Sequence, residues 1–375
     1  MEEQAILKDV IFFILYGGVI MLAAVASLYL LLRRGNAIAP EVTSPVRLRR
    51  WTAAFLMACV LSHVNWLLYV YYPSPTAFAI VCSLDIFLLI PTIAGVLLSM
   101  LQDRRRPVWP VLATLAPVLV LIAVWLIRGN DAVLVPVSVY VYVLYALMML
   151  YMFFAVRRYG RWLRDNYADL EHKEIWQSFL ILAGFLLFFV MYNSTTEGSR
   201  ILIYLLQIDC IIIVALLLWR VETLQQLSES NANENPAEEE VQKTSVPPSI
   251  PANIGPLLKK HCENKRLYLQ NDLTLAQLAN AIGTNRYYLS QYFAQQGLTY
   301  NAYINGLRVS HFIRLYHEAV GDQRIFTAQQ LAFESGYHSY STFSAAFKQY
   351  TGKAVTAWMR STDHSFNYAQ QTTEH

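Results

Sequence analysis

The chain changes character near residue 220 when its hydrophobic and polar positions are followed along all 375 residues. Before that point, long apolar runs alternate with short polar stretches, and after it apolar residues recur every three or four positions. An apolar run of about 20 residues is long enough for a helix to cross a bilayer, whereas the later spacing is typical of one-sided helices in water. The pattern therefore predicts an all-α chain with a membrane half followed by a soluble half.

Seven apolar runs in the first half are long enough for transmembrane helices. They cover 10–32, 51–71, 77–101, 108–126, 133–154, 175–192 and 201–219. We expect the first run to be retained, because acidic residues precede it and Arg33 and Arg34 follow it, the reverse of a signal peptide. The prediction is a seven-helix transmembrane bundle over residues 1–227, in which the last helix continues as an extension over 220–227. Val221 and Leu224 of that extension have the spacing of a short dimer seam.

Basic residues are concentrated on alternate sides of the predicted bundle. The connections after the first, third and fifth runs carry 13 Lys or Arg, whereas the other side carries three. Cytoplasmic loops carry the excess of these residues. We therefore expect a multi-pass membrane protein, with its N-terminus outside and its C-terminus in the cytoplasm.

The soluble half contains the same short pattern twice. The first copy is LTLAQLANAIGTNRYYLSQYF over 273–293, and the second is FTAQQLAFESGYHSYSTFSAAF over 326–347. Each has a Thr followed three residues later by a Gln, the spacing of a capping box that starts a helix, and then a Gly suited to ending that helix. An apolar pair four residues apart holds a second helix by one face. Each copy predicts a helix-turn-helix unit, with one extra residue in the second turn.

The length of the region between the copies and the positive charge of this half are both suited to DNA binding. Residues 299–318 contain no Pro and predict one continuous helix of about 30 Å, which can separate the two second helices by roughly one turn of DNA, about 34 Å. From Asn253 to Arg360 there are 11 Lys or Arg against 5 Asp or Glu. A positive balance of this kind favours contacts with phosphates.

Residues 256–360 resemble the DNA-binding domain of the AraC/XylS family of bacterial transcription regulators. The resemblance rests on LAxxxG in both copies, YLSQYF, Arg308, GYHSYSTFSAAFKQYTG over 336–352 and a closing Arg360. The resemblance implies two recognition helices in successive major grooves and, together with the predicted bundle, a location in the bacterial inner membrane. Ala345 stands where the family often has an Arg that contacts bases, and Val355 where it usually has Pro, so we expect the second helix to read sequence less. The implied DNA contacts are Arg286, Tyr287, Ser290, Gln291, Ser339, Tyr340, Ser341 and Lys348.

The two halves are joined by a polar stretch. Residues 228–251 are acidic and contain Pro, a composition typical of a disordered linker. The predicted order is the membrane domain over 1–227, a flexible linker over 228–252, the DNA-binding domain over 253–360 and a tail over 361–375.

Three ionisable residues lie near the middle of predicted membrane helices: His63, Asp85 and Asp209. Ionisable groups at that depth are costly, and they are candidates for function by default. One interpretation is an intramembrane signal site, in which His63 changes charge near neutral pH and the aspartates are its partners. The other is an interhelical hydrogen-bond cluster that only determines how the helices pack.

The sequence indicates no enzyme. The four cysteines lack the spacing of metal ligands, and no catalytic ordering or phosphate-binding loop is present, so we expect no cofactor and no metal. The function predicted is a membrane-embedded one-component transcription regulator that binds DNA sequence-specifically in response to a signal at the membrane. The expected partners are double-stranded DNA and membrane lipid, with RNA polymerase, a second copy of the chain and an unidentified signal ligand as further candidates. The alternative is a membrane scaffold or transporter-like protein whose helical C-terminal domain binds a protein partner.

Overall fold

The computed structural model describes residues 10–33, 35–128, 134–180, 182–184, 200–227 and 253–362. Throughout these ranges the regular elements are helices, and the all-α prediction is confirmed. The chain divides into two compact units. The first comprises Met1–Gly160 and His172–Asn233, and the second comprises Arg161–Glu171 and Glu234–His375. The predicted linker over 228–252 lies outside the described residues, as does most of the predicted tail.

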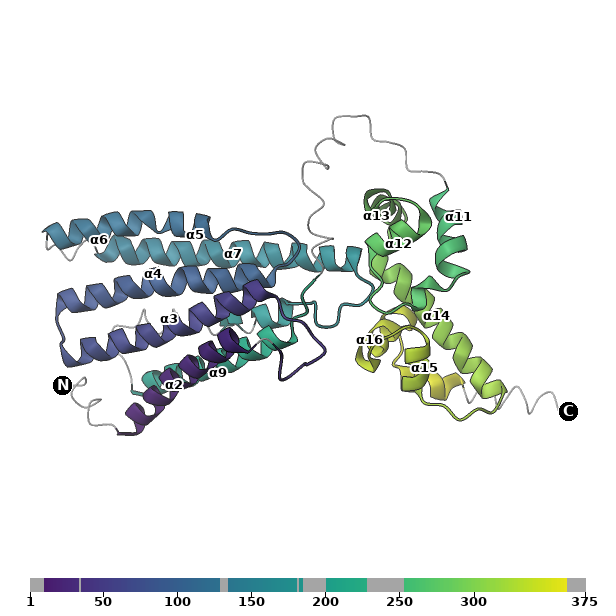
Figure 1. Cartoon of the computed structure of the whole chain (residues 1–375), viewed down its shortest axis with the longest axis horizontal. Coiled ribbons are helices and arrows are strands. Elements are labelled where there is room, and N and C mark those ends of the chain that lie inside the picture. The colour runs from purple at the N-terminus through teal and green to yellow at the C-terminus, as the bar shows by residue number, and fades with distance from the viewer. Residues whose placement is uncertain are drawn as a thin grey trace, which may run out of the picture. The chain divides into compact units, whose positions relative to one another are not determined.

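The first unit is a bundle of long helices (Figure 1). Helix α3 packs against both α2 and α4, and α9 packs against α2 and α3. Helix α7 continues past the first unit, because its residues from Arg161 onward belong to the second. The helices are α2 (Val10–Leu32), α3 (Val46–Tyr71), α4 (Pro75–Met100), α5 (Trp109–Thr114), α6 (Ala116–Arg128), α7 (Leu134–Asn166) and α9 (Arg200–Thr223).

Five helices in the described ranges are long and apolar enough to cross a membrane: α2, α3, α4, α7 and α9. The fourth predicted run is divided into α5 and α6 at Leu115. Pro117 explains this break, because proline has no amide hydrogen and its ring clashes with the carbonyl four residues earlier. The sixth predicted run, 175–192, lies largely outside the described residues. The count of seven is therefore approximate, and the several long apolar helices are consistent with a membrane domain.

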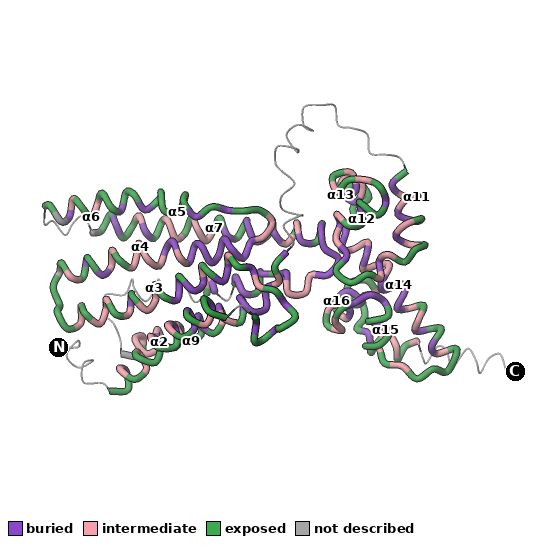
Figure 2. The backbone as a smooth tube through the Cα atoms, in the orientation of Figure 1, coloured by how far each residue is buried: buried purple, intermediate pink, exposed green. Residues whose placement is uncertain are grey.

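Large apolar side chains point outward from these helices. Ile11 and Ile14 of α2 are both 71% exposed, and Leu147 and Phe154 of α7 are 58% and 59% exposed. Figure 2 shows exposed positions along each helix of the bundle, interrupted by buried ones. Exposed apolar side chains along several helices are costly in water and favourable against lipid.

The end of α9 differs from the prediction. The helix ends at Thr223, and Leu224–Leu227 continue as non-helical chain, so the predicted helical extension to residue 227 is wrong. The backbone there bonds to loops instead: Gln226 N donates to the Thr43 carbonyl at 2.7 Å, and Gln225 N donates to the His172 carbonyl at 2.9 Å. Val221 and Leu224 are fully buried inside the unit, so the predicted dimer seam is occupied by the chain itself.

The second unit has two hydrophobic cores that share one long helix. Tyr300 and Ile304 of α14 belong to the first core, and Val309, Phe312 and Tyr316 belong to the second. A last helix, 355–362, closes the second core through Val355. The other helices are α11 (Ile254–Leu258), the π turn η3 (Lys259–Glu263), the 3-10 turn η4 (Leu267–Leu269), α12 (Leu275–Ile282), α13 (Arg286–Gln295), α14 (Tyr300–Gly321), α15 (Ala328–Glu334) and α16 (Tyr340–Thr351).

Candidate nucleic-acid interface

The first helix-turn-helix unit consists of α12 and α13. Thr274 forms a complete capping box at the start of α12: its hydroxyl accepts from Gln277 N at 3.2 Å, and the Gln277 side chain accepts from Thr274 N at 2.9 Å. Gly283 ends α12 with φ 75°, a left-handed conformation that glycine adopts without strain. Asn285 then caps α13 by accepting from Tyr288 N at 2.9 Å. The predicted cap and turn are confirmed.

The second unit, α15 and α16, repeats this geometry with a longer turn. Thr327 and Gln330 form the same capping box, with distances of 3.1 and 2.9 Å. The glycine Gly336 has φ 86°, and Ser339 caps α16 by accepting from Thr342 N. Three positions separate Gly336 from its cap, against two from Gly283 to Asn285, so the predicted extra residue lies in this turn. Tyr337 fills it and is buried.

Each second helix is held by the apolar pair that its spacing predicts. Leu289 and Phe293 of α13 are buried in the first core, and Phe343 and Phe347 of α16 are fully buried in the second. The ring of Phe312 on α14 lies 4.4 Å from that of Phe343. Both helices are therefore anchored by one face and present the opposite face outward.

Arg308 joins the two helix-turn-helix units and is unavailable to DNA. Its guanidinium is buried, and it donates from Nε to the Tyr268 carbonyl at 2.7 Å and from Nη2 to the Gln270 carbonyl at 2.8 Å. It also lies over the ring of Tyr337 in the second turn, 5.5 Å from the ring centroid. Burial lowers the pKa of Arg308 from its usual value. Arg308, which carries part of the family resemblance, therefore holds the two helix-turn-helix units together.

The predicted DNA contacts divide into exposed and half-buried residues. Tyr287 is 46% exposed, and Ser290, Ser341 and Lys348 are also exposed. The remaining four, Arg286, Gln291, Ser339 and Tyr340, are half-buried. All eight lie on α13, on α16 or at the cap of α16, so the fold gathers them on the two recognition helices. Their contacts with DNA remain predictions.

Three of the half-buried residues are constrained in ways that the pattern did not indicate. The Oε1 atom of Gln291 is shielded from solvent and has no hydrogen-bond partner among the described residues. The ring of Tyr340 packs against Phe343 with centroids 5.7 Å apart, and Ser339 caps its own helix. These side chains are less free to reach a base than the exposed ones.

A segment that the sequence did not single out, Arg161–Glu171, belongs to the same unit. Tyr167 and Thr274 form an antiparallel bridge, and Ala168 is buried in the first core. The Ala168 carbonyl accepts from Asn301 Nδ2 at 2.7 Å and from Asn305 Nδ2 at 3.2 Å. Residues 161–166 of this segment end α7, and residues 167–171 are non-helical. No motif marks the non-helical part, because short irregular stretches pack through backbone bonds that any sequence can make.

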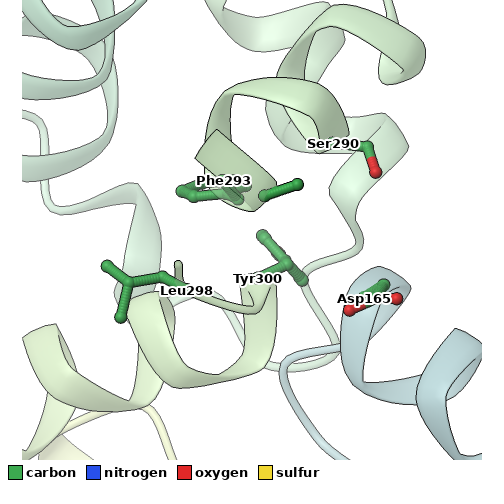
Figure 3. Close-up of a pocket in the computed structure, with 6 residues that line it drawn as sticks. Asp165, Ser290, Phe293, Leu298 and Tyr300 are labelled. Atoms are coloured by element: carbon green, nitrogen blue, oxygen red, sulfur yellow. The ribbon is translucent and has the colours of Figure 1, made fainter. Parts of the chain in front are cut away.

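A hollow of about 70 Å³ lies where this segment meets α13 and the start of α14, within the second unit. Figure 3 shows Asp165, from the end of α7, and Ser290, from α13, on the same side of this hollow. Phe293, Ala294, Leu298 and Tyr300 line the rest.

Of the three ionisable residues predicted at membrane depth, His63 and Asp85 lie together and Asp209 lies apart. The Asp85 carboxylate interacts electrostatically with His63 and accepts from Trp66 Nε1 at 2.6 Å. The His63 Nδ1 atom is 2.8 Å from the Cys59 carbonyl, and Gln207 of α9 lies beside the ring. Asp209 interacts with neither, and its Oδ2 is buried without a hydrogen-bond partner in the part of the chain described. The structure therefore brings together His63, Asp85 and Gln207.

Two capped helix pairs, each ending in an outward-facing second helix, define the class of the second unit as a double helix-turn-helix protein. Comparison with protein families found that residues 278–361 match the family described as helix-turn-helix domain. Over these residues the chain is similar to AraC-type helix-turn-helix domains, which are DNA-binding regulator domains. The comparisons with curated proteins and with solved structures found no match.

Proposed function

We propose that the protein is a membrane-embedded one-component transcription regulator, in which one chain contains both the membrane domain and the DNA-binding domain. The DNA-binding domain, residues 253–360, is called the reader below. The observation that carries this proposal is the duplicated helix-turn-helix geometry, complete in both copies from capping box to anchored second helix. The domain match over 278–361 and the long apolar helices of the first unit support it. A chain of this kind needs no separate messenger between membrane and promoter.

In this proposal, the reader binds two successive major grooves through α13 and α16. The connecting helix α14 has 22 residues and is about 33 Å long, close to one turn of DNA. Tyr287 and Ser290 on α13 and Ser341 on α16 contact base edges or the adjacent backbone, and Lys348 contacts a phosphate. The caps of both helices also offer backbone N–H groups to phosphates.

DNA binding is tested with the full-length protein in lipid nanodiscs and a pool of random-sequence duplexes. Repeated selection for bound duplexes is expected to enrich one motif with two half-sites about one helical turn apart. Enrichment of a single half-site would mean that only one recognition helix reads sequence. Absence of retained DNA at low salt would overturn the proposal.

The orientation proposed follows from the distribution of basic residues, with the reader in the cytoplasm. Reporter fusions at positions 75 and 130 are expected to behave as external, and fusions at 40, 104 and 165 as cytoplasmic. A cytoplasmic signal at position 130 would contradict the seven-crossing topology.

A further inference from the structure

The segment Arg161–Glu171 places a carboxylate at each recognition helix. Asp165 lines the hollow beside Ser290 of α13. Glu171 Oε2 accepts from the Thr342 hydroxyl of α16 at 3.0 Å. The Thr342 hydroxyl is also 3.1 Å from that of Ser339, which in turn lies 2.9 Å from that of Ser341. One segment of 11 residues thus reaches predicted DNA-contact residues on both helices.

The position of Glu171 resembles that of a bound phosphate. It lies at the first turn of α16, where unpaired backbone N–H groups and the helix dipole favour negative charge. Serine and threonine hydroxyls at such helix ends are common donors to phosphate oxygens in DNA complexes. A carboxylate that accepts from Thr342 offers the same groups an anion of the same sign, and it repels a phosphate that approaches them.

The docked segment is held by more than charge. Ala168 N donates to the Leu273 carbonyl at 3.4 Å, and Asn301 and Asn305 both donate to the Ala168 carbonyl. A third acid, Asp169, is buried and interacts electrostatically with Arg308. The surface that receives the segment is formed by Leu273, Thr274, Asn301, Asn305 and Thr342, so it includes both helix-turn-helix units and the helix between them.

We propose that Arg161–Glu171 is an internal competitor of DNA, which docks on the reader and must leave both recognition helices before they can enter a duplex. The proposal rests on the DNA-binding function proposed above and adds a regulatory state to it. The next residue, His172, belongs to the first unit, where its carbonyl accepts from Gln225 N beyond the end of α9. A single peptide bond therefore joins the residue bonded to α16 to the residue bonded to the chain leaving α9. Movement of that chain has a direct covalent route to Glu171.

Removal of the two carboxylate charges tests the competition. We expect the double variant Asp165→Asn with Glu171→Gln to bind the random duplex pool roughly three- to tenfold more tightly than wild type, because more molecules are in the open state. Both changes preserve side-chain size. The control is Glu318→Gln, which removes one carboxylate charge from an exposed face of α14, outside the docked segment. We expect its affinity for the duplex pool to stay close to that of wild type, with only a small gain from weaker repulsion of DNA.

A double-mutant cycle between Glu171→Gln and Thr342→Val locates the effect in their contact. The gain from the first change is expected to shrink when the second is present, because Glu171→Gln removes the charge of the acceptor and Thr342→Val removes the donor of the same hydrogen bond. Fully additive gains would mean that Glu171 acts only through its general charge, and the docking proposal would be overturned.

Hydrogen exchange separates a competitor from a permanent structural support. In the full-length protein in nanodiscs, we expect peptides covering residues 161–171 to lose protection when the duplex pool is added, while peptides of α13 and α16 gain it. Unchanged or increased protection of 161–171 in the DNA complex would overturn the inference and leave the DNA-binding function standing. If neither wild type nor variants bind DNA, the proposed function itself fails.

Discussion

A glycine with positive φ lies in each of the two helix-turn-helix turns, but the space around the two glycines differs. Gly283 and Gly336 both adopt positive φ, at 75° and 86°. A Cβ on Gly283 would meet open space, whereas a Cβ on Gly336 would lie 2.7 Å from the backbone of Leu269. The first glycine is needed for its conformation alone, and the second also for close approach of two backbone segments.

We expect Gly336→Ala to cost more stability than Gly283→Ala. Gly283→Ala incurs only left-handed strain of about 1–2 kcal/mol. Gly336→Ala adds overpacking against the backbone of Leu269, for a total of about 2–4 kcal/mol. The measurement is the free energy of opening from hydrogen exchange of the full-length protein, taken in α12 and α13 for Gly283→Ala and in α15 and α16 for Gly336→Ala. Equal costs at both positions would contradict the close approach to Leu269.

Lys348 is the exposed basic residue that the resemblance places at DNA. We expect Lys348→Ala to weaken binding to all duplexes alike and to reduce the slope of log affinity against log salt by about one, because one phosphate contact is lost. The control is Lys260→Ala, an equal charge change at an exposed lysine outside the predicted contacts. A change in which base pairs are preferred, with an unchanged slope, would assign Lys348 to base reading instead.

At the scale of elements, start signals and the shared helix determine the reader. Helices α12 and α15 have eight and seven residues, too few to be stable alone, so they depend on their caps and on packing. Helix α14 supplies side chains to both cores, so it connects the two helix-turn-helix units. Changes in caps should therefore be felt locally, and changes in α14 throughout the unit.

Loss of either capping hydroxyl is expected to destabilise its own helix. Thr274→Ala and Thr327→Ala should each cost about 1 kcal/mol, seen as faster hydrogen exchange in α12 and α15 respectively. Thr356→Ala, at an exposed position of helix 355–362, is the control and should change little. If each cap variant accelerated exchange equally in both helices, the caps would be acting on the whole unit and not locally.

His311 of α14 makes the stability of the reader depend on pH. Burial, with Arg314 and Arg266 nearby, lowers the pKa of this histidine below its usual 6.5, although Glu318 and Glu334 oppose the shift. The folded state therefore favours the neutral ring, so its stabilising contribution is complete above pH 6.5 and is lost as the pH falls towards the folded pKa. We expect the unfolding temperature of the second unit to be lower at pH 5 than at pH 7.

The control for that prediction separates His311 from the other histidines. His311→Gln should flatten the pH dependence, whereas His317→Gln on the same helix should retain it, because His311 is then intact. Circular dichroism of the full-length protein at both pH values measures the transition. An equal fall in unfolding temperature for wild type and His311→Gln would assign the pH effect elsewhere.

At the scale of the whole molecule, the question is how the bundle and the reader communicate. His63, Asp85 and Gln207 bring together α3, α4 and α9, and α9 leads into the chain that three loops hold. Gln102 bonds both Gln225 O and Leu227 N at 2.9 Å in this region. Packed elements therefore connect these three residues to the exit of α9.

We expect His63→Gln and Asp85→Asn to shift reporter transcription in cells non-additively, because their side chains interact. Asp209→Asn should also shift it, and additively with either, because Asp209 interacts with neither of them. The measurement is reporter output with the abundance of protein in the membrane quantified beside it. Unchanged output at equal abundance for all three variants would leave these residues only a packing role.

Much of this protein was determined locally by its sequence. The apolar runs, the capping boxes at Thr274 and Thr327, the two glycines and the apolar pairs are short-range signals, since each acts within one or two helical turns. They predicted the all-α class, the positions of α12 to α16 and the extra residue in the second turn. The same short range explains the break at Pro117.

Only the tertiary structure decided how distant segments combine. The end of α9 at Thr223 depends on carbonyls from loops far away in sequence, and so does the separation of Asp209 from His63 and Asp85. Half of the predicted DNA contacts are partly covered for the same reason, since burial depends on neighbours that spacing does not reveal. Nothing in the sequence marked the docking of Arg161–Glu171, because this segment docks through backbone carbonyls and a few side chains that become partners only when the chain has folded.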